Sequence, residues 1–243
     1  MIDLVISNGN VFVWSAEDWL TLRREHRIIG ATIGCPHTLP RQEIMQGLPL
    51  MILPEEVTIL LENKIARLVE YPSLRQEPDD DMRKKTLDDA TAEAVKRVEI
   101  DRDALLAEQL SKYPKLDPDD SLVQIHTIYP WNIDVREVEW NYPQTAQEKL
   151  RCEVFKDFWK KGCYLTLGEK FGGDYLVYPG DPVMFHSQFI VSCMDIDEEI
   201  PILNLTGQCR VACHVRKTQV YAYFSDDNKV AYQSFQYDNS NMI

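Results

Sequence analysis

The stretch GCYLTLGEKFGGDYLVYPGDPVMFHSQF, residues 162–189, has the pattern of short strands separated by turns. Two turn-forming clusters, Gly172-Gly173-Asp174 and Pro179-Gly180-Asp181-Pro182, bracket a short apolar run that ends in Tyr178. Glycine, proline and aspartate favour turns because they supply the backbone angles and local hydrogen bonds that turns require. The pattern predicts a hairpin in which the ends of the two strands bring Tyr178 near His186.

The same segment belongs to a series of predicted elements that begins with a helix near Ala146. The apolar side chains of that helix fall on one face, and Gly162 ends it. Alternating apolar residues predict the strands that follow, and a short helix lies between the third and the fourth. The helix face comprises Leu150, Val154, Phe155, Phe158 and Trp159; the strands are 164–167, 175–178, 185–193, 217–224 and 229–237, and the short helix spans 202–213.

The first seventy residues predict a compact α/β unit. Asn8-Gly9 between two apolar runs is a strong hairpin signal. Ser15 followed by Asp18 resembles a capping box at the start of a helix that runs to about His26. Pro54 opens a second helix, and the runs GLPLMILP and KIARLVEY predict one strand before that helix and one after it.

The middle of the chain differs in composition, with abundant charge and an excess of acids between residues 76 and 120. Its apolar row is too sparse for a buried helix and indicates an exposed helical spacer, with a docking surface for a partner as the functional alternative. The composition therefore predicts an N-terminal α/β domain over 1–75, a charged, partly helical connector over 76–145, and a second domain over 146–243.

Composition also limits the class of protein. The formal net charge of −13 argues against a general nucleic-acid binder. No window approaches the length of a membrane span, and the N-terminus does not resemble a leader, so a soluble intracellular protein is expected. The cysteines form no CxxC pair; scattered core thiols are expected, and a zinc site at Cys209, Cys213 and His214 would need a second ligand pair.

Three side chains are candidates for chemistry: Tyr178, His186 and Lys217, the last at the point where a helix gives way to a strand. A base, an acid and a cation suffice for RNA cleavage without a metal, because the ribose 2′-hydroxyl is itself the nucleophile. Each residue also has a structural alternative: the tyrosine packing on the turn, the histidine bonded to backbone, and the lysine solvated.

A metal-dependent nuclease is the main rival among enzymes. Such a site needs two acids and a lysine, with a D/E-x-K spacing on one strand to hold magnesium. Here Glu169 and Lys170 are adjacent, and Asp174 and Asp181 stand in turns, where turn roles account for them. No cofactor and no metal ligand set are predicted.

The quoted stretch strongly resembles the defining block of tRNA-splicing endonuclease catalytic subunits, and VRKTQVYAYF, residues 215–224, resembles their second block. The family's catalytic tyrosine, histidine and lysine match Tyr178, His186 and Lys217. The segments NGNVFVW and GLPLMILPEEVTILLE are similar to the start of the eukaryotic subunit that cuts the 3′ splice site. The resemblance covers roughly residues 1–72 and 148–237.

The resemblance implies an α+β protein: a small mixed N-terminal α/β domain and a C-terminal tRNA-intron-endonuclease-like domain with a mixed sheet flanked by helices. It implies cleavage of intron-containing pre-tRNA that leaves a 2′,3′-cyclic phosphate and a 5′-hydroxyl. Tyr178 would be the general base, His186 the general acid and Lys217 the electrostatic stabiliser, although the first two roles could be exchanged. A free phenol has a pKa of about 10, and a nearby Lys217 would lower it.

The family also implies partners. Its enzyme contains a second catalytic subunit and two structural subunits, and the last strand, KVAYQSFQY, would pair with a structural subunit along its open edge. A non-catalytic scaffold of the same assembly is the alternative within the family, against which the intact trio argues. A nuclear location is expected, with the mitochondrial outer surface as the alternative.

Overall fold

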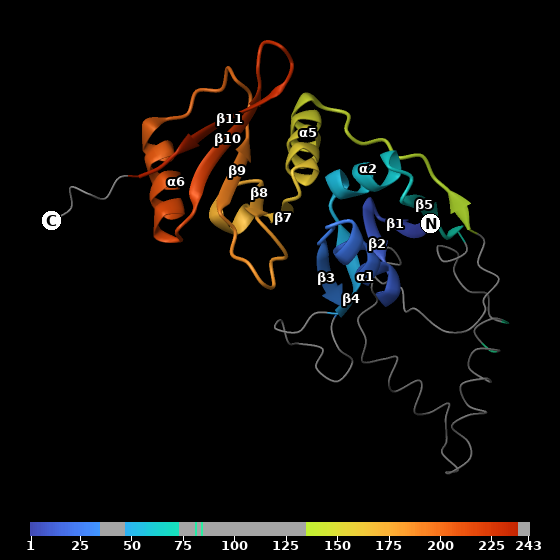
Figure 1. Ribbon diagram of the computed structural model, residues 1–243. Coiled ribbons are helices and arrows are strands. Elements are labelled where there is room, and N and C mark those ends of the chain that lie inside the picture. Colours follow the sequence, from blue (N-terminus) through green and yellow to red (C-terminus); the bar gives the residue numbers. More distant parts are fainter. Residues whose placement is uncertain (35–46, 73–80, 82–83, 85–134, 238–243) are drawn as a thin grey trace. The chain divides into compact units, whose positions relative to one another are not determined.

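The computed structural model describes residues 1–34, 47–72, 81, 84 and 135–237 (Figure 1). Residues Met1–Glu70 and Glu137–Ile243 form one compact unit. The chain forms two sheets, and one short strand of the first, Arg136–Glu137, lies in the segment predicted as a connector. The helical spacer predicted between residues 76 and 120 lies outside the described residues.

The N-terminal sheet is mixed and has the strand order β3-β4-β2-β1-β5-β6. Strand β1 pairs with β2 in the antiparallel sense and with β5 in the parallel sense, while β4 pairs with both β2 and β3. The strands are β1 (Ile2–Ser7), β2 (Asn10–Val13), β3 (Ala31–Gly34), β4 (Gly47–Ile52), β5 (Ala66–Glu70) and β6 (Arg136–Glu137).

Local sequence signals explain most of this domain. Asn8 and Gly9 have φ of 47° and 76°, the left-handed region in which asparagine and glycine are favoured, and they confirm the predicted hairpin. Helix α1 (Ala16–Glu25) begins where Ser15 Oγ accepts a hydrogen bond from the backbone of Asp18. Helix α2 (Pro54–Glu62) begins at the predicted proline.

Strand β3 was not predicted. Its four residues, ATIG, are partly buried or exposed, so the segment lacks the apolar alternation that marks a strand in sequence. Pairing with β4 creates this strand. The core of the domain is formed by Leu4, Val13, Leu22, Ile28, Leu50, Val57, Leu60 and Leu68, with neighbouring apolar residues.

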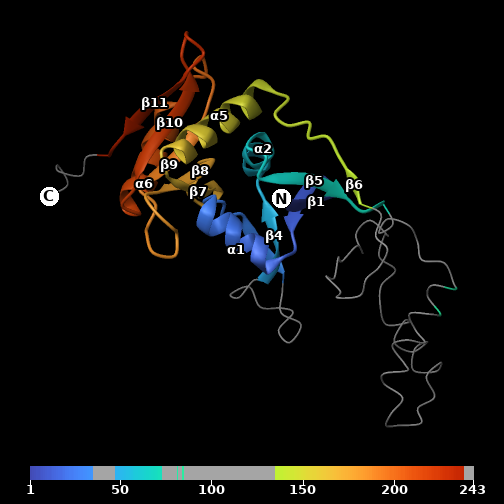
Figure 2. The same cartoon turned by 45° about the vertical axis from the view of Figure 1, so that its right-hand side comes forward.

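The C-terminal sheet has the order β11-β10-β9-β8-β7, and its strands follow one another in this order in Figures 1 and 2. Strands β9 and β10 are parallel, and the other neighbours are antiparallel. In chain order the elements are α5 (Ala146–Lys160), β7 (Tyr164–Leu167), a 3-10 turn (Glu169–Phe171), β8 (Tyr175–Tyr178), β9 (Phe189–Cys193), α6 (Ile202–His214), β10 (Thr218–Phe224) and β11 (Val230–Phe235).

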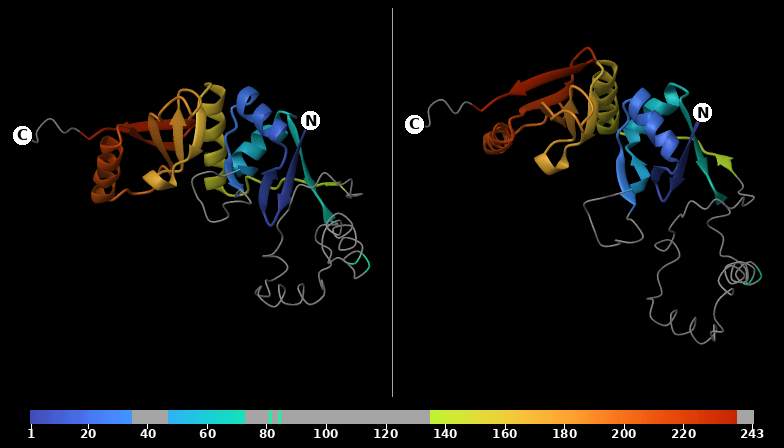
Figure 3. Two further views of the ribbon diagram at one scale, coloured as in Figure 1. Left: turned by 90° about the horizontal axis from the view of Figure 1, so that it is seen from below. Right: turned by 60° about the horizontal axis from the view of Figure 1, so that its bottom comes forward.

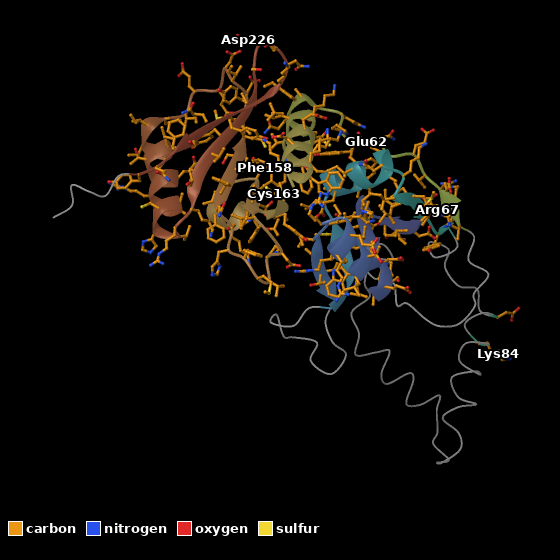
Figure 4. The ribbon with its side chains drawn as sticks, in the orientation of Figure 1. Glu62, Arg67, Lys84, Phe158, Cys163 and Asp226 are labelled. Carbon is orange, nitrogen blue, oxygen red and sulfur yellow. The ribbon has the colours of Figure 1, made fainter. Side chains whose placement is uncertain are left out.

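Helices α5 and α6 cover opposite faces of this sheet (Figure 3). Successive residues of a strand point to opposite faces, and here Tyr175 and Val177 pack with α5 whereas Leu176 packs with Ala212 of α6. Phe158 and Cys163, labelled in Figure 4, lie near the C-terminal end of α5. A mixed sheet flanked by helices, beside a small mixed N-terminal domain, confirms the predicted fold class.

The structure corrects one boundary. We predicted a strand over 185–193 with His186 at its start, but β9 begins at Phe189. The backbone N–H groups of Met184 and Phe185 donate to the carbonyl of Asp181, at 2.8 and 3.0 Å, and close a turn. Because a turn uses these donors, the segment before Phe189 is a loop, and His186 stands in that loop.

Cys152, Cys193 and Cys209 are buried free thiols, as predicted, whereas Cys163 and Cys213 are only partly buried. None of the described helices has the length and apolar character that crossing a membrane requires.

Candidate functional site

The three candidate residues lie at the same end of three neighbouring strands of the C-terminal sheet. Tyr178 is the last residue of β8, His186 lies three residues before the first residue of β9, and Lys217 directly precedes β10. Strand β8 runs antiparallel to β9, and β9 runs parallel to β10. The last residue of β8 and the first residues of β9 and β10 therefore lie at the same end of the sheet.

Gln188 joins the three segments through its backbone. Its N–H donates to the carbonyl of Val177 at 2.9 Å, next to Tyr178, and its carbonyl accepts from the N–H of Thr218 at 2.9 Å, next to Lys217. The backbone of the loop that carries His186 is therefore tied on both sides to the residues that precede or follow the other two candidates.

Lys217 leans toward the loop. Its Nζ donates to the carbonyl of Ser187 at 3.4 Å and lies 5.5 Å from the centre of the Phe171 ring. An ammonium over an aromatic face is attracted by the ring quadrupole. The lysine head is therefore held beside the residue that follows His186, and Phe171 is a contact that the sequence did not reveal.

Tyr178 packs on the α6 face of the sheet with Leu176, Ile190 and Phe171. Its hydroxyl lies 3.4 Å from Thr166 Oγ1 on the neighbouring strand β7, which donates a weak hydrogen bond to it. Phe171 thus contacts the tyrosine cluster and the lysine head at once. His186 stands in the exposed loop before β9.

None of the three candidate side chains hydrogen-bonds another in the described part of the chain. The structure brings their backbones together at one end of the sheet. There Phe171 packs on the same apolar cluster as Tyr178 and lies under the ammonium of Lys217.

The turn between Tyr178 and His186 is anchored by Asp181. Its carboxylate accepts from the backbone of Val183 at 2.9 Å and from the guanidinium of Arg23, at 2.6 and 2.9 Å. The hydrogen bonds from Arg23 hold the pKa of Asp181 below its usual value. The predicted turn role of Asp181 is confirmed, but its partner is 158 residues away in sequence, and no sequence signal identified it.

The other turn carboxylate, Asp174, is also engaged. Its Oδ2 accepts from the backbone of Cys193 at 2.7 Å, and its Oδ1 lies 3.4 Å from Arg151. Among the residues that the structure describes, no three His, Cys, Asp or Glu side chains form a group that could hold a metal ion. The carboxylates that a metal nuclease would need thus serve the turns that carry them.

A cavity of about 340 Å³ lies over the Gly172–Asp174 turn and the segment before α6. Its lining includes Ser192, Glu198 and Tyr221 but none of the three candidates. The candidate residues lie outside this cavity, and the side chain of His186 is exposed.

Comparison with known proteins matches both folded segments. A family described as "TSEN34-like, N-terminal domain" matches residues 2–71, and a family described as "tRNA intron endonuclease, catalytic C-terminal domain" matches residues 149–232. Together the two matches span more than half of the chain. The mouse protein "tRNA-splicing endonuclease subunit Sen34" is 27% identical over 98% of this chain and 99% of its own length.

The chain belongs to the Sen34 family of tRNA-splicing endonuclease subunits. A probable Sen34 subunit of Schizosaccharomyces pombe is 25% identical over 91% of the chain and 86% of its own length. A tRNA-splicing endonuclease of Saccharolobus islandicus is 38% identical over 69 residues, 28% of the chain and 38% of its own length. The Sen34 relatives match nearly the whole chain, whereas the archaeal protein matches a short part of it, so the resemblance drawn from sequence is confirmed.

Proposed function

We propose that this Sen34-family chain is the catalytic subunit that cuts intron-containing pre-tRNA at the 3′ splice site, without a metal ion. The catalytic domain of the family is present, and an endonuclease is therefore supported. The proposal of the cleavage site and its chemistry is supported by one observation: Tyr178, His186 and Lys217 stand at the same end of three neighbouring strands.

The proposed reaction is an internal transfer of the phosphodiester. Tyr178 removes the proton from the ribose 2′-hydroxyl, and O2′ attacks the adjacent phosphorus. As the P–O2′ bond forms, the P–O5′ bond breaks, and His186 donates a proton to the departing O5′. Lys217 offsets the extra negative charge on the phosphorane. The products are a 2′,3′-cyclic phosphate and a 5′-hydroxyl, and the same balance holds if Tyr178 and His186 exchange roles.

The proposal includes partners. A chain with a formal charge of −13 repels RNA when alone, so basic surfaces of other subunits would supply part of the grip. We propose a second catalytic subunit and two structural subunits. Strand β11 pairs with β10 on one side and is the edge of its sheet, and it is the proposed contact with a structural subunit. A nuclear location, or the mitochondrial outer surface, is part of the same proposal.

The test uses the complex purified through a tagged full-length chain, with a radiolabelled intron-containing pre-tRNA. In complexes carrying His186→Ala, we expect 3′-site cleavage to fall by about 100-fold or more, because general acid catalysis contributes roughly that much. Binding of pre-tRNA should persist. His214→Ala, at the end of α6, is the matched control because it also removes an exposed histidine.

Two further measurements separate the alternatives. Cleavage in excess EDTA should continue, whereas a magnesium-dependent site would lose all activity. The fragment upstream of the 3′-site cut should end in a 2′,3′-cyclic phosphate. Its 3′ end should therefore resist periodate oxidation until the cyclic phosphate is opened and removed. Unchanged 3′-site cleavage by the His186→Ala complex would leave the scaffold alternative and refute the catalytic role.

A further inference from the structure

The loop between Tyr178 and His186 is held by polar contacts rather than by burial. Val183, Met184 and Phe185 are 79%, 78% and 50% exposed, so apolar packing contributes little to the conformation of this loop. Asp181 organises it instead: its carbonyl accepts from two backbone N–H groups, and its carboxylate accepts from a third, that of Val183. The direction in which the chain reaches His186 therefore depends on Asp181.

Asp181 in turn is fixed by the N-terminal domain. Arg23 of α1 binds it through both oxygens, with Nη2 to Oδ1 at 2.6 Å and Nε to Oδ2 at 2.9 Å. A two-pronged guanidinium–carboxylate pair fixes orientation as well as distance, which a single contact does not. The two side chains are only 20% and 31% exposed. Each carboxylate oxygen is used, and Oδ1 is shared between Arg23 and Val183.

Helix α1, which carries Arg23, is held against α5 by contacts next to its C-terminal end. Next to the C-terminal end of the helix, the carbonyl of His26 accepts from Trp159 Nε1 at 2.6 Å, and Arg27 donates to the carbonyl of Trp159 at 3.1 Å. The guanidinium of Arg27 also lies over the Trp159 ring at 5.2 Å. Trp159 belongs to α5, so the helix that carries Arg23 is itself docked on the C-terminal domain.

We propose that Arg23 is a positioning residue of the nuclease site: through Asp181 it fixes the loop that presents His186 to the substrate. This inference rests on the function proposed above. It gives the N-terminal domain a part in catalysis. Both side chains keep some contact with water, which limits what the pair adds to stability. Its loss should therefore alter the cleavage rate far more than the melting temperature.

The experiment compares complexes assembled with full-length chains carrying Arg23→Ala, Arg24→Ala or His186→Ala. Arg24 is the adjacent exposed residue of the same helix, so its replacement removes the same charge and leaves Asp181 bound. Single-turnover cleavage at the 3′ site should fall about 10- to 100-fold in Arg23→Ala, the effect expected when a catalytic group is misplaced by about 1 Å. It should change less than about twofold in Arg24→Ala.

Three readouts separate positioning from general damage. Cleavage at the 5′ site, pre-tRNA affinity and complex assembly should all stay within about twofold of wild type in Arg23→Ala. Arg23→Lys, which keeps the charge but not the fork, should give an intermediate 3′ rate. The double variant Arg23→Ala/Asp181→Ala should be no slower than Asp181→Ala alone, because the two residues act through one contact.

The outcomes are distinguishable. Equal 3′ rates for Arg23→Ala and Arg24→Ala, with His186→Ala inactive, would overturn this inference and leave the proposed function standing. Parallel loss of 5′ and 3′ cleavage in Arg23→Ala would also overturn it, since that pattern indicates failed assembly. Undiminished cleavage by His186→Ala would instead refute the proposed function itself.

Discussion

Glu56 is a buried carboxylic acid whose protonation affects the stability of the N-terminal domain. It is fully buried, and its carboxylate accepts from the backbone N–H groups of Ile29, Gly30 and Leu53, at 3.1, 3.2 and 2.9 Å. These bonds tie the segment before β3 to the start of α2. Burial raises the pKa of Glu56 to about 7, and the three donors only partly oppose that effect.

The raised pKa predicts a pH dependence of stability. The folded state binds a proton more tightly than the unfolded state, whose carboxyl titrates near 4.5. The stabilisation is therefore fully present below that pH and is lost as pH rises through about 7. The unfolding free energy of wild type relative to Glu56→Gln should fall by roughly 3 kcal/mol across this window. A difference that stays constant in urea titrations from pH 4.5 to 7.5 would contradict it.

At the scale of elements, two glycines distinguish a turn that needs glycine from a helix that does not. A Cβ at Gly168, between β7 and the 3-10 turn, would lie 2.9 Å from the carbonyl oxygen of Gly173 and 2.9 Å from the backbone of Tyr175. A Cβ at Gly207, inside α6, would meet nothing within 4 Å. The first glycine permits a close backbone approach, and the second only adds chain entropy to the unfolded state.

Alanine should therefore have opposite effects at the two positions. Gly168→Ala should lower the free energy of unfolding by about 1–3 kcal/mol, because backbone atoms cannot make room for the methyl group. Gly207→Ala should raise it by about 0.5–1 kcal/mol, because alanine is the better helix former. Urea denaturation of the two variants, followed by far-UV circular dichroism, measures both. Effects of the same sign would show that the packing around Gly168 is wrongly described.

At the scale of the whole molecule, the two sheets are coupled through α2 and α5. Glu55 of α2 is almost completely buried, and its Oε1 accepts from the hydroxyl of Tyr142 at 2.7 Å and lies 3.2 Å from Arg151 Nε. Arg151 also reaches Asp174 and stacks on Tyr175. A second ion pair outside this cluster, Lys156 with Glu62 at 2.8 Å, links the same two helices.

Replacing Arg151 alone should lower the free energy of unfolding more than replacing Arg151 and Glu55 together. Arg151→Met should lower the free energy of unfolding by about 3 kcal/mol, because it leaves the buried carboxylate of Glu55 without its cation. Adding Glu55→Gln should recover most of that loss, because the amide is neutral and still accepts from Tyr142. A double-mutant cycle in urea measures the coupling, and purely additive losses would show that the two residues do not act as a pair.

The sequence predicted those features whose causes lie between residues close together in the chain. The Asn8-Gly9 hairpin, the Ser15 cap and most strands were correct because their causes lie within a few residues. The trio Tyr178, His186 and Lys217 was found by a motif, and its catalytic role stays a prediction. Strand β3 was missed and the start of β9 was misplaced, since pairing and a turn anchor, not local propensity, decide both.

The sequence alone predicted most of the helices and strands and their apolar faces, and it singled out three side chains whose catalytic role stays a prediction. Only the tertiary structure decided what those side chains stand beside: Phe171 under Lys217, and Arg23 on the Asp181 turn. The physical reason is that helix and strand signals act over a few neighbouring residues. A guanidinium and a carboxylate 158 positions apart meet only when both domains have folded and docked.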